Sequence, residues 1–461
     1  MSDLIAEDLF SDPEIKKAKE ILLNTIQKYK NKITKTEKAK DSLAKTFKSD
    51  LEKFATLRGG NLYYPYIGSG IGNGALVELT DGSIKYDFIT GIGVHYFGHS
   101  HEEIISASID AALQDTVMQG HLQQNKDSME LMEIILKGAN KNAKEFDHCF
   151  ISTTGAQANE NALKIIFQKK SPANRILCFE NCFAGRTLAL AQLTDKAAYR
   201  DGLPPTIATD YLPYYDKSNH QGSIDKTLKV LTSHLTRHKN RYAGMCFELI
   251  QGEGGYTPGN EEFFKAIIKV LKENNIAVWV DEVQTIGRTT ELFAFQHFHL
   301  ENEIDVLTLG KMAQVCATLY SDDFKPRPGL ISQTFTSSTS AIKSSIRLFQ
   351  LLQEENIFGE KGKIIQVHNH FVDHFKKLNK KYPNDFTGPY GLGAMIAFTS
   401  FDGDLAKSKE FASKLFENGL IGFIAGHDPV RIRFLLPILS VTLEDIDKAV
   451  EIIEKTYLEL K

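Results

Sequence analysis

An apolar run in the middle of the chain ends on two adjacent acids. Residues 276–280 read IAVWV, and Asp281 and Glu282 follow directly. A buried strand has little reason to end on a carboxylate unless something there needs the charge, because removing an unpaired charge from water is costly. In an open α/β sheet, ligands bind at the carboxyl ends of the strands. Asp281 is therefore a candidate binding residue, and the other strand ends are the places to look for more.

A lysine follows another apolar run. Residues 304–310 read IDVLTLG, and Lys311 comes next among apolar and small residues. Burial lowers the pKa of a lysine and makes its amine nucleophilic, which is what an imine with a carbonyl cofactor requires. The alternative is an ordinary lysine whose ammonium group reaches solvent along its stem.

Three other strand ends carry polar groups. After HCFIS, residues 153–156 read TTGA and run into a helical pattern, whose first N–H groups could bind a phosphate. After RILCFE, Phe183 and Arg186 could stack on a planar ring and bind a carboxylate. After AGMCFELI, glycines surround Glu253 and could present its carboxylate in a tight turn. Each has a plainer alternative: a helix start that binds nothing, a buried Phe beside a surface Arg, and a glycine-rich surface loop.

These five strand ends together match the needs of pyridoxal phosphate. Its phosphate binds at a helix N-terminus, its ring needs an aromatic face, and its aldehyde needs a lysine. Its pyridine nitrogen needs an aspartate that keeps it protonated, so that the ring can withdraw electrons from a carbanion. We therefore expect Asp281 to face the pyridinium nitrogen, where a charge-assisted hydrogen bond is strong because water is scarce.

The elements that must position these residues form an α/β protein. From about residue 100 to 345, short apolar strands alternate with helical stretches, which predicts a mostly parallel sheet. TDGS at residues 80–83 predicts a hairpin turn, and residues 13–57 predict two charged helices. We expect four parts: a helical N-terminal extension (1–58), the N-terminal part of a small domain (59–95), a large cofactor-binding domain (96–345) and a C-terminal small domain (346–461).

The composition excludes several other classes. The 461 residues are 42% hydrophobic and 24% charged, which is ordinary for a globular enzyme, and a net charge of −4 gives no field for nucleic acid or anionic membrane. Neither a signal peptide nor a bilayer-spanning run is recognisable, so we expect a cytoplasmic protein. The five cysteines lack ligand spacing, and GHSH at residues 98–101 has no accompanying ligand pattern. We expect no metal site.

The motifs as a set resemble the class III aminotransferases, which are pyridoxal-phosphate enzymes of fold type I. The resemblance covers roughly residues 60–455. It is carried by TTGAQANENALK, FAGRT, ELIQGEGG, WVDEVQTIGRTTELFAFQ, TLGK, QTF and VRIRFLLPILSVTLEDID. It implies a large domain with a mostly parallel seven-stranded sheet and a smaller α/β C-terminal domain.

The resemblance also implies roles toward the cofactor. Lys311 would bind the aldehyde as an imine and then move the proton between substrate and cofactor. Asp281 would hold the pyridinium nitrogen. The remaining cofactor contacts would be Gln284 on the phenolic oxygen, Val283 and Phe183 on the two ring faces, and Gly155, Ala156 and Thr334 of the partner subunit on the phosphate. A shared phosphate site implies a homodimer.

Three residues would select the substrates. By resemblance, Arg186 would bind a distal carboxylate, and Arg433 would bind the α-carboxylate of glutamate or 2-oxoglutarate. Glu253 would pair with Arg433 when the donor has no carboxylate at its reacting end. This set favours an ω-aminotransferase that moves a terminal amine from 4-aminobutyrate, lysine or ornithine to 2-oxoglutarate by a ping-pong mechanism. The alternatives are an aminomutase, a decarboxylase, or a non-catalytic binding protein, which the presence of both Lys311 and Asp281 disfavours.

Three segments depart from the family pattern. Ala184 stands where the family usually has histidine, and residues 336–339 read TSST where it has Gly-Gly-Asn-Pro. Residues 310–316, GKMAQVC, are also unusual, and they resemble lysine 6-aminotransferases, as does the spacing of RIRFLLP. The resemblance therefore extends to both 4-aminobutyrate and lysine 6-aminotransferases, and the donor stays open.

Overall fold

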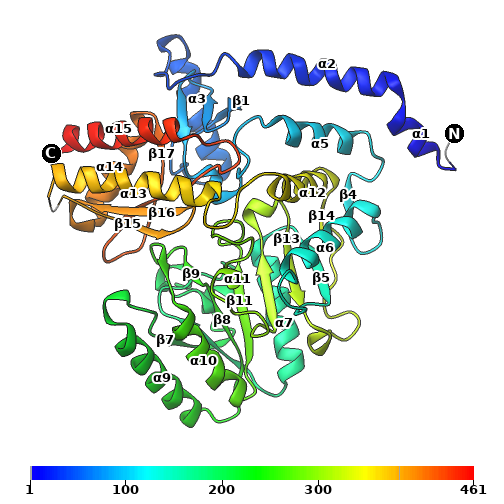
Figure 1. Ribbon diagram of the computed structural model, residues 1–461, viewed down its shortest axis with the longest axis vertical. Helices are drawn as coiled ribbons and strands as arrows, with labels where there is room; N and C mark the ends of the chain where they lie inside the picture. Colours follow the sequence, from blue (N-terminus) through cyan, green and yellow to red (C-terminus); the bar gives the residue numbers. More distant parts are fainter. Residues whose placement is uncertain (1–2, 384) are drawn as a thin grey trace.

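A large central sheet and two smaller sheets organise the chain. The computed structural model describes residues 3–383 and 385–461. Figure 1 shows the large sheet with its helices in the lower part of the view and the smaller sheets with the C-terminal helices in the upper left. Two N-terminal helices run along the top of the same view.

The central sheet has seven strands and is mostly parallel, as predicted. β13 pairs antiparallel with both of its neighbours, and the other pairs are parallel. Strands β8 and β11 are buried along their whole length, which explains why their sequences are continuous apolar runs rather than alternating ones. The strand order is β5 (His148–Ser152), β13 (Cys316–Tyr320), β12 (Val306–Leu309), β11 (Ala277–Glu282), β8 (Tyr242–Phe247), β6 (Arg175–Phe179) and β7 (Ala208–Leu212).

Helices cover this sheet because each buries an apolar stripe against it. In α10 (Glu261–Glu273), the buried residues include Phe263, Phe264 and Ile267, which recur at helical spacing. α7 (Gly155–Lys170) contacts five strands of the sheet and so fixes the strand ends beside its own N-terminus. The other helices of this part are α5 (Glu102–Ala112), α6 (Lys126–Ala139), α9 (His220–Arg237) and α12 (Thr339–Glu354).

Two four-stranded sheets form the second part of the molecule. One contains β1 (Gly68–Asn73), β2 (Leu76–Leu79), β3 (Ile84–Asp87) and β17 (Leu420–Ile421), and the other contains β15 (Phe386–Leu392), β16 (Met395–Ser400), β19 (Arg431–Leu435) and β18 (Phe423–Ala425). The predicted hairpin turn joins β2 to β3. Because β17 pairs parallel with β3, the N-terminal strands and the C-terminal segment share one sheet. Helices α13 (Lys363–Lys381), α14 (Leu405–Glu417) and α15 (Leu443–Leu460) belong to this part.

The N-terminal extension is helical. α2 (Pro13–Lys30) and α3 (Asp41–Arg58) are the two predicted helices, and α1 (Ile5–Ser11) precedes them. Pro13 starts α2, and the Asp12 side chain accepts a hydrogen bond from the Glu14 N–H as its cap. Lys19 pairs with Asp110 of α5 at 2.7 Å. No helix among the described residues is both long and apolar enough to cross a membrane.

Short elements complete the fold: α4 (Thr90–Gly93), β4 (Met118–Gln119), α8 (Leu190–Leu193), β9 (Ile250–Gln251), β10 (Thr257–Pro258), α11 (Ala294–His297) and β14 (Ser337–Ser338), with 3₁₀ turns η1 (Ala197–Tyr199), η2 (Lys217–Asn219), η3 (Lys311–Ala313), η4 (Asp322–Phe324) and η5 (Phe401–Gly403). α12 spans the domain limit proposed at residues 345 and 346.

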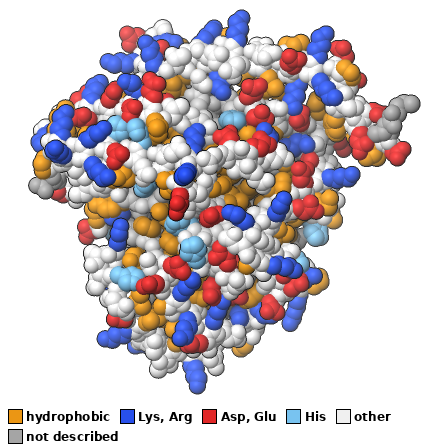
Figure 2. Space-filling model, in the orientation of Figure 1, with side chains coloured by type: hydrophobic (Ala, Val, Ile, Leu, Met, Phe, Trp, Pro, Cys, Tyr) orange, Lys and Arg blue, Asp and Glu red, His pale blue; other side chains and the backbone are white. Residues whose placement is uncertain are grey.

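Figure 2 shows acidic and basic side chains interspersed over one face of the molecule.

Candidate active site

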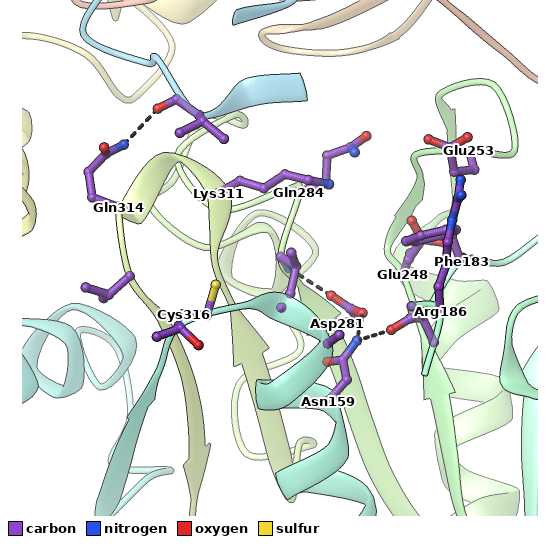
Figure 3. Close-up of a pocket in the computed structure, with 18 residues that line it drawn as sticks. Asn159, Phe183, Arg186, Glu248, Glu253, Asp281, Gln284, Lys311, Gln314 and Cys316 are labelled. Atoms are coloured by element: carbon purple, nitrogen blue, oxygen red, sulfur yellow. Dashed lines mark hydrogen bonds between the residues drawn. The ribbon is translucent and has the colours of Figure 1, made fainter. Parts of the chain in front are cut away.

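A cavity of about 480 Å³ lies at the carboxyl ends of β6, β8, β11 and β12, beside the N-terminus of α7. This is where ligands bind in open α/β sheets. Figure 3 shows Lys311 and Gln284 on one side of it and Phe183, Arg186 and Glu253 on the other. Nine of the predicted site residues line the cavity: Gly155, Ala156, Phe183, Arg186, Glu253, Asp281, Val283, Gln284 and Lys311.

Asp281 and Lys311 come from adjacent parallel strands. In the register of β11 and β12, Asp281 is paired with Thr308, and Lys311 follows two residues after β12 ends. Lys311 has a φ of 48°, which is uncommon for a residue with a side chain and marks local strain at the start of η3. The strand register and this turn together bring the carboxylate and the amine to one cavity.

The protein environment shifts the pKa values of both groups. Burial, and after it the positive charge of Arg433, lower the pKa of Lys311 to about 8, although the nearby acids oppose this shift. Burial raises the pKa of Asp281, while a hydrogen bond from the Val283 N–H at 2.8 Å and one from Asn159 favour its charged form. Much of the Lys311 amine is therefore neutral near pH 8, as a nucleophile requires.

Asn159 is a site residue that the motifs did not reveal. Its Nδ2 donates to Asp281 Oδ2 at 2.7 Å and to the Ala184 carbonyl at 2.7 Å. It lies in α7 four residues after Gly155, so it faces the same side as the start of the helix. Ala184, where the family usually has histidine, thus contributes a backbone acceptor that orients the amide beside Asp281.

The two side chains predicted to pack on the faces of the ring both line the cavity. Phe183 comes from the loop after β6, and Val283 comes from the loop after β11. A Cβ on Gly155 would lie 2.8 Å from Val283 Cγ1, so the first turn of α7 approaches Val283 closely. Gly155 and Ala156 are the first residues of that helix, where N–H groups have no partner within the helix. An anion beside them would meet free donors and the positive end of the helix dipole.

Glu248 is a second residue that the motifs did not reveal. Its carboxylate accepts hydrogen bonds from the N–H groups of Phe183 at 3.0 Å and Gly252 at 2.9 Å. It therefore joins the loop that carries Phe183 to the loop that carries Glu253. Burial, and after it the negative charge of Asp281, raise the pKa of Glu248 to about 8.

Glu253 and Arg433 form an ion pair at the cavity. Arg433 Nη2 lies 2.5 Å from Glu253 Oε1, and Arg433 Nη1 donates to the Gly252 carbonyl at 3.2 Å. Arg433 is fully buried in β19. Burial alone would raise the pKa of Glu253, yet the Arg433 charge brings it below its ordinary value. Removing Glu253 from Arg433 would leave a buried cation in need of another carboxylate.

Arg186 is the exposed cation of the cavity wall. Its guanidinium stacks over the Tyr199 ring at 3.9 Å from the ring centre. The Phe183 ring stands perpendicular to the same Tyr199, with ring centres 6.4 Å apart. Stacking limits the positions of the guanidinium and keeps its N–H donors free for a planar carboxylate.

Thr334 lies outside this cavity. It is exposed and lines a separate hollow of about 580 Å³ together with Gly120 and His121. The TSST segment, which differs from the family pattern, is held by its own chain, since the Thr336 N–H donates to the Gln119 carbonyl at 2.8 Å and β14 pairs with β4.

His99 in the GHSH loop pairs with Asp87 at 2.9 Å in a buried position, so the fold supplies a carboxylate that local spacing did not indicate.

The residues present fit pyridoxal phosphate. The buried side-chain oxygens of Gln284 and Asn159, which both line the cavity, have no hydrogen-bond partner within the described chain. Such groups call for donors from a bound molecule. A helix start for phosphate, two ring walls, a carboxylate and a partly neutral lysine surround the same space.

The chain matches known proteins over most of its length. The family model "Aminotransferase class-III" matches residues 68–457. The chain is 31% identical over 385 residues to an acetylornithine aminotransferase of Lactococcus lactis, covering 80% of this chain and 92% of that one. The acetylornithine aminotransferase of Methanocaldococcus jannaschii is 28% identical over 410 residues, covering 85% and 93%.

Solved structures of the same fold are also similar. A lysine aminotransferase from M. tuberculosis superposes with a TM-score of 0.78 at 21% identity, covering 89% of this chain and all (100%) of that one. An ornithine aminotransferase from Toxoplasma gondii gives a TM-score of 0.74 at 23% identity, covering 89% and 95%. The chain belongs to the class III aminotransferases. It is a pyridoxal-phosphate-dependent transaminase with the fold predicted from its sequence.

Proposed function

We propose that the protein moves the terminal amino group of an ω-amine donor to 2-oxoglutarate by a ping-pong mechanism, giving a semialdehyde and glutamate. The ion pair between Glu253 and Arg433 at the cavity of Lys311 carries this proposal. Relatives named for acetylornithine, and fold neighbours named for lysine and ornithine, support a donor whose reacting amine ends a short chain. Donors of this class also carry a carboxylate remote from that amine.

The cofactor, when bound, supplies the electron sink that makes a proton on the substrate carbon acidic. Lys311 Nζ takes that proton and returns one, because its lowered pKa leaves a neutral amine available near pH 8. Asp281 would hold the pyridine nitrogen in its protonated form, and Asn159, which donates to Asp281, would orient it for that contact. Gln284 would contact the phenolic oxygen, and Gly155 and Ala156 would hold the phosphate.

Substrate choice rests on three charged residues. With an ω-amine donor, Glu253 neutralises Arg433, since the reacting end of that donor has no carboxylate. With glutamate or 2-oxoglutarate, Glu253 turns away and Arg433 binds the α-carboxylate. Arg186, held over Tyr199 on the same side of the cavity as Glu253 and Phe183, binds the remote carboxylate of either substrate.

We further propose a cytoplasmic homodimer with shared sites. Thr334 is exposed and lies away from the cavity of its own chain, which suits a role at the phosphate of the partner subunit. Exposed apolar side chains accompany it on the surface, namely Met118, Leu122 and Phe335, all of which line or adjoin the same hollow. Burial of such side chains between two copies is favourable.

The half-reaction tests the proposed donor class. Purified enzyme is mixed separately with 4-aminobutyrate, lysine, ornithine, N-acetylornithine and glutamate, and loss of the visible absorbance of the lysine-bound cofactor is followed. We expect glutamate and at least one ω-amine to convert the cofactor, with an aldehyde as the product of the latter. Release of carbon dioxide, or amine migration without a free carbonyl product, would instead indicate a decarboxylase or an aminomutase.

A further inference from the structure

Two helices of the second part bring three metal-ligand side chains to one point. His370 and His374 lie four residues apart in α13, and Asp447 lies in α15, which packs against it. Figure 1 shows α13 (yellow) and α15 (red) next to each other in the upper left of the view. Spacing of four places both imidazoles on one helix face, as in helical zinc sites.

The distances within this cluster suit a shared cation. Both His370 Nε2 and His374 Nε2 lie 2.6 Å from Asp447 Oδ1. The two nitrogens lie 3.3 Å from each other. Two nitrogens bound to one tetrahedral zinc at about 2.05 Å are separated by roughly 3.3 Å. A small outward movement of the carboxylate, whose side chain is 44% exposed, would open space for the ion.

Hydrogen bonding alone explains this arrangement less well. Both rings would have to carry their proton on Nε2 and donate to the same carboxylate oxygen, with their nitrogens in contact distance. A divalent cation removes that conflict because one ion replaces both protons and is bound by a lone pair from each of the three atoms. The cluster is half-buried, with side-chain exposures of 28% for His370 and 19% for His374, so an ion and a completing water could reach it from solvent.

We propose that His370, His374 and Asp447 bind a first-row divalent cation of the zinc class. A set of two imidazoles and one carboxylate binds such cations in preference to Mg²⁺ or Ca²⁺, which prefer oxygen ligands. The ion connects the C-terminal helix α15 to α13 and thereby stabilises this part of the molecule. It is separate from the cavity of Lys311, none of whose lining residues belongs to either helix.

Zinc binding to the holoenzyme tests this proposal. The enzyme is freed of metal with a chelator, retained cofactor is verified by its visible absorbance, and ZnCl₂ is titrated by calorimetry. We expect one equivalent of Zn²⁺ per chain and a rise in Tm on binding, since an ion that binds the folded state alone stabilises it. Co²⁺ in place of Zn²⁺ should give the visible absorption bands of a four-coordinate site.

The variants His370→Gln, His374→Gln and Asp447→Asn should each weaken zinc binding at least about tenfold and remove the rise in Tm. His220→Gln is the matched control, because His220 also pairs with an acid, Glu262 at 2.8 Å, but has no second histidine beside it. Asp447→Asn keeps the shape of the side chain, so its zinc affinity still tests the proposal if a histidine variant misfolds. Absence of saturable binding, or unchanged affinity in the three variants, would overturn the proposal.

Discussion

Asn159 Nδ2 lies 2.7 Å from Asp281 Oδ2, and this contact joins the two ends of the cofactor site. Asp281 ends β11, whereas Asn159 lies one turn into α7, the helix whose first residues are proposed to hold the phosphate. The helix proposed to hold the phosphate therefore also orients the carboxylate proposed to contact the ring nitrogen.

Asn159→Ala should weaken cofactor binding and slow turnover. A hydrogen bond to a charged group contributes about 1.5–3 kcal/mol, so we expect cofactor affinity to fall about tenfold or more. Equilibrium dialysis or loss of visible absorbance on dilution measures this. The matched control is Asn161→Ala, which removes a buried amide of the same helix that instead bonds Ser152 at 3.2 Å. Equal losses in both variants would show that helix stability, not Asp281, is affected.

The stability of the cofactor-free protein should rise with pH because of Lys311. Its pKa is about 8 in the folded protein against 10.5 ordinarily. Between these values the unfolded chain binds a proton that the folded chain does not, so the free energy of unfolding increases with pH by roughly 3 kcal/mol. Below pH 8 the Lys311 amine is charged in both the folded and the unfolded chain, so the free-energy cost of burying its charge no longer changes with pH. Denaturant unfolding at pH 7 and pH 10 should show the rise, and Lys311→Met should show a smaller one because the contribution of Lys311 is gone. The same rise in both proteins would contradict the assignment.

Glu253→Ala should separate the two half-reactions. Without the carboxylate, Arg433 stays positively charged beside the reacting end of an ω-amine, whereas glutamate supplies its own carboxylate. We expect the rate constant over Kd for the ω-amine to fall at least tenfold more than that for glutamate. Stopped-flow measurement of each half-reaction gives both values from one protein. Equal losses would indicate a structural role for the ion pair.

Gly155→Ala should displace a wall of the site. Its Cβ would lie 2.8 Å from Val283 Cγ1, which is closer than such atoms approach in proteins. Either the side chain or the start of α7 must shift, and we expect weaker cofactor binding with little change in secondary structure. Gly60→Ala is a suitable control, because its Cβ would meet nothing within 4 Å. Wild-type cofactor affinity in Gly155→Ala would show that the first turn of α7 is free to move.

The residues found from the sequence are those that follow a recognisable strand. Asp281, Lys311 and Phe183 each come after an apolar run, and parallel pairing brings such ends to one edge of a sheet. Glu248 follows the same rule but was missed, because the apolar run through Ile250 hid the end of β8 at Phe247. Asn159 was missed because it lies on a helix. Which side of α7 faces the cavity depends on how the helix packs against the sheet, and the local sequence does not indicate this.

Other features depend on contacts between distant segments. The antiparallel placement of β13 between β5 and β12 follows from strand order, which local patterns do not contain. His370 and His374 lie four residues apart, but Asp447 is 73 residues from His374, so local spacing did not indicate the third side chain of the cluster. The pairing of β17 with β3 likewise joins segments from opposite ends of the chain.

Nitrogen labelling shows which amino group of the donor reaches glutamate. The enzyme is incubated with 2-oxoglutarate and with lysine or ornithine carrying ¹⁵N at either the terminal or the α position, and with ¹⁵N-labelled 4-aminobutyrate. We predict that glutamate acquires ¹⁵N from the terminal amine of an accepted donor and none from the α-amine. Transfer from the α position, or unlabelled glutamate with every donor, would contradict it.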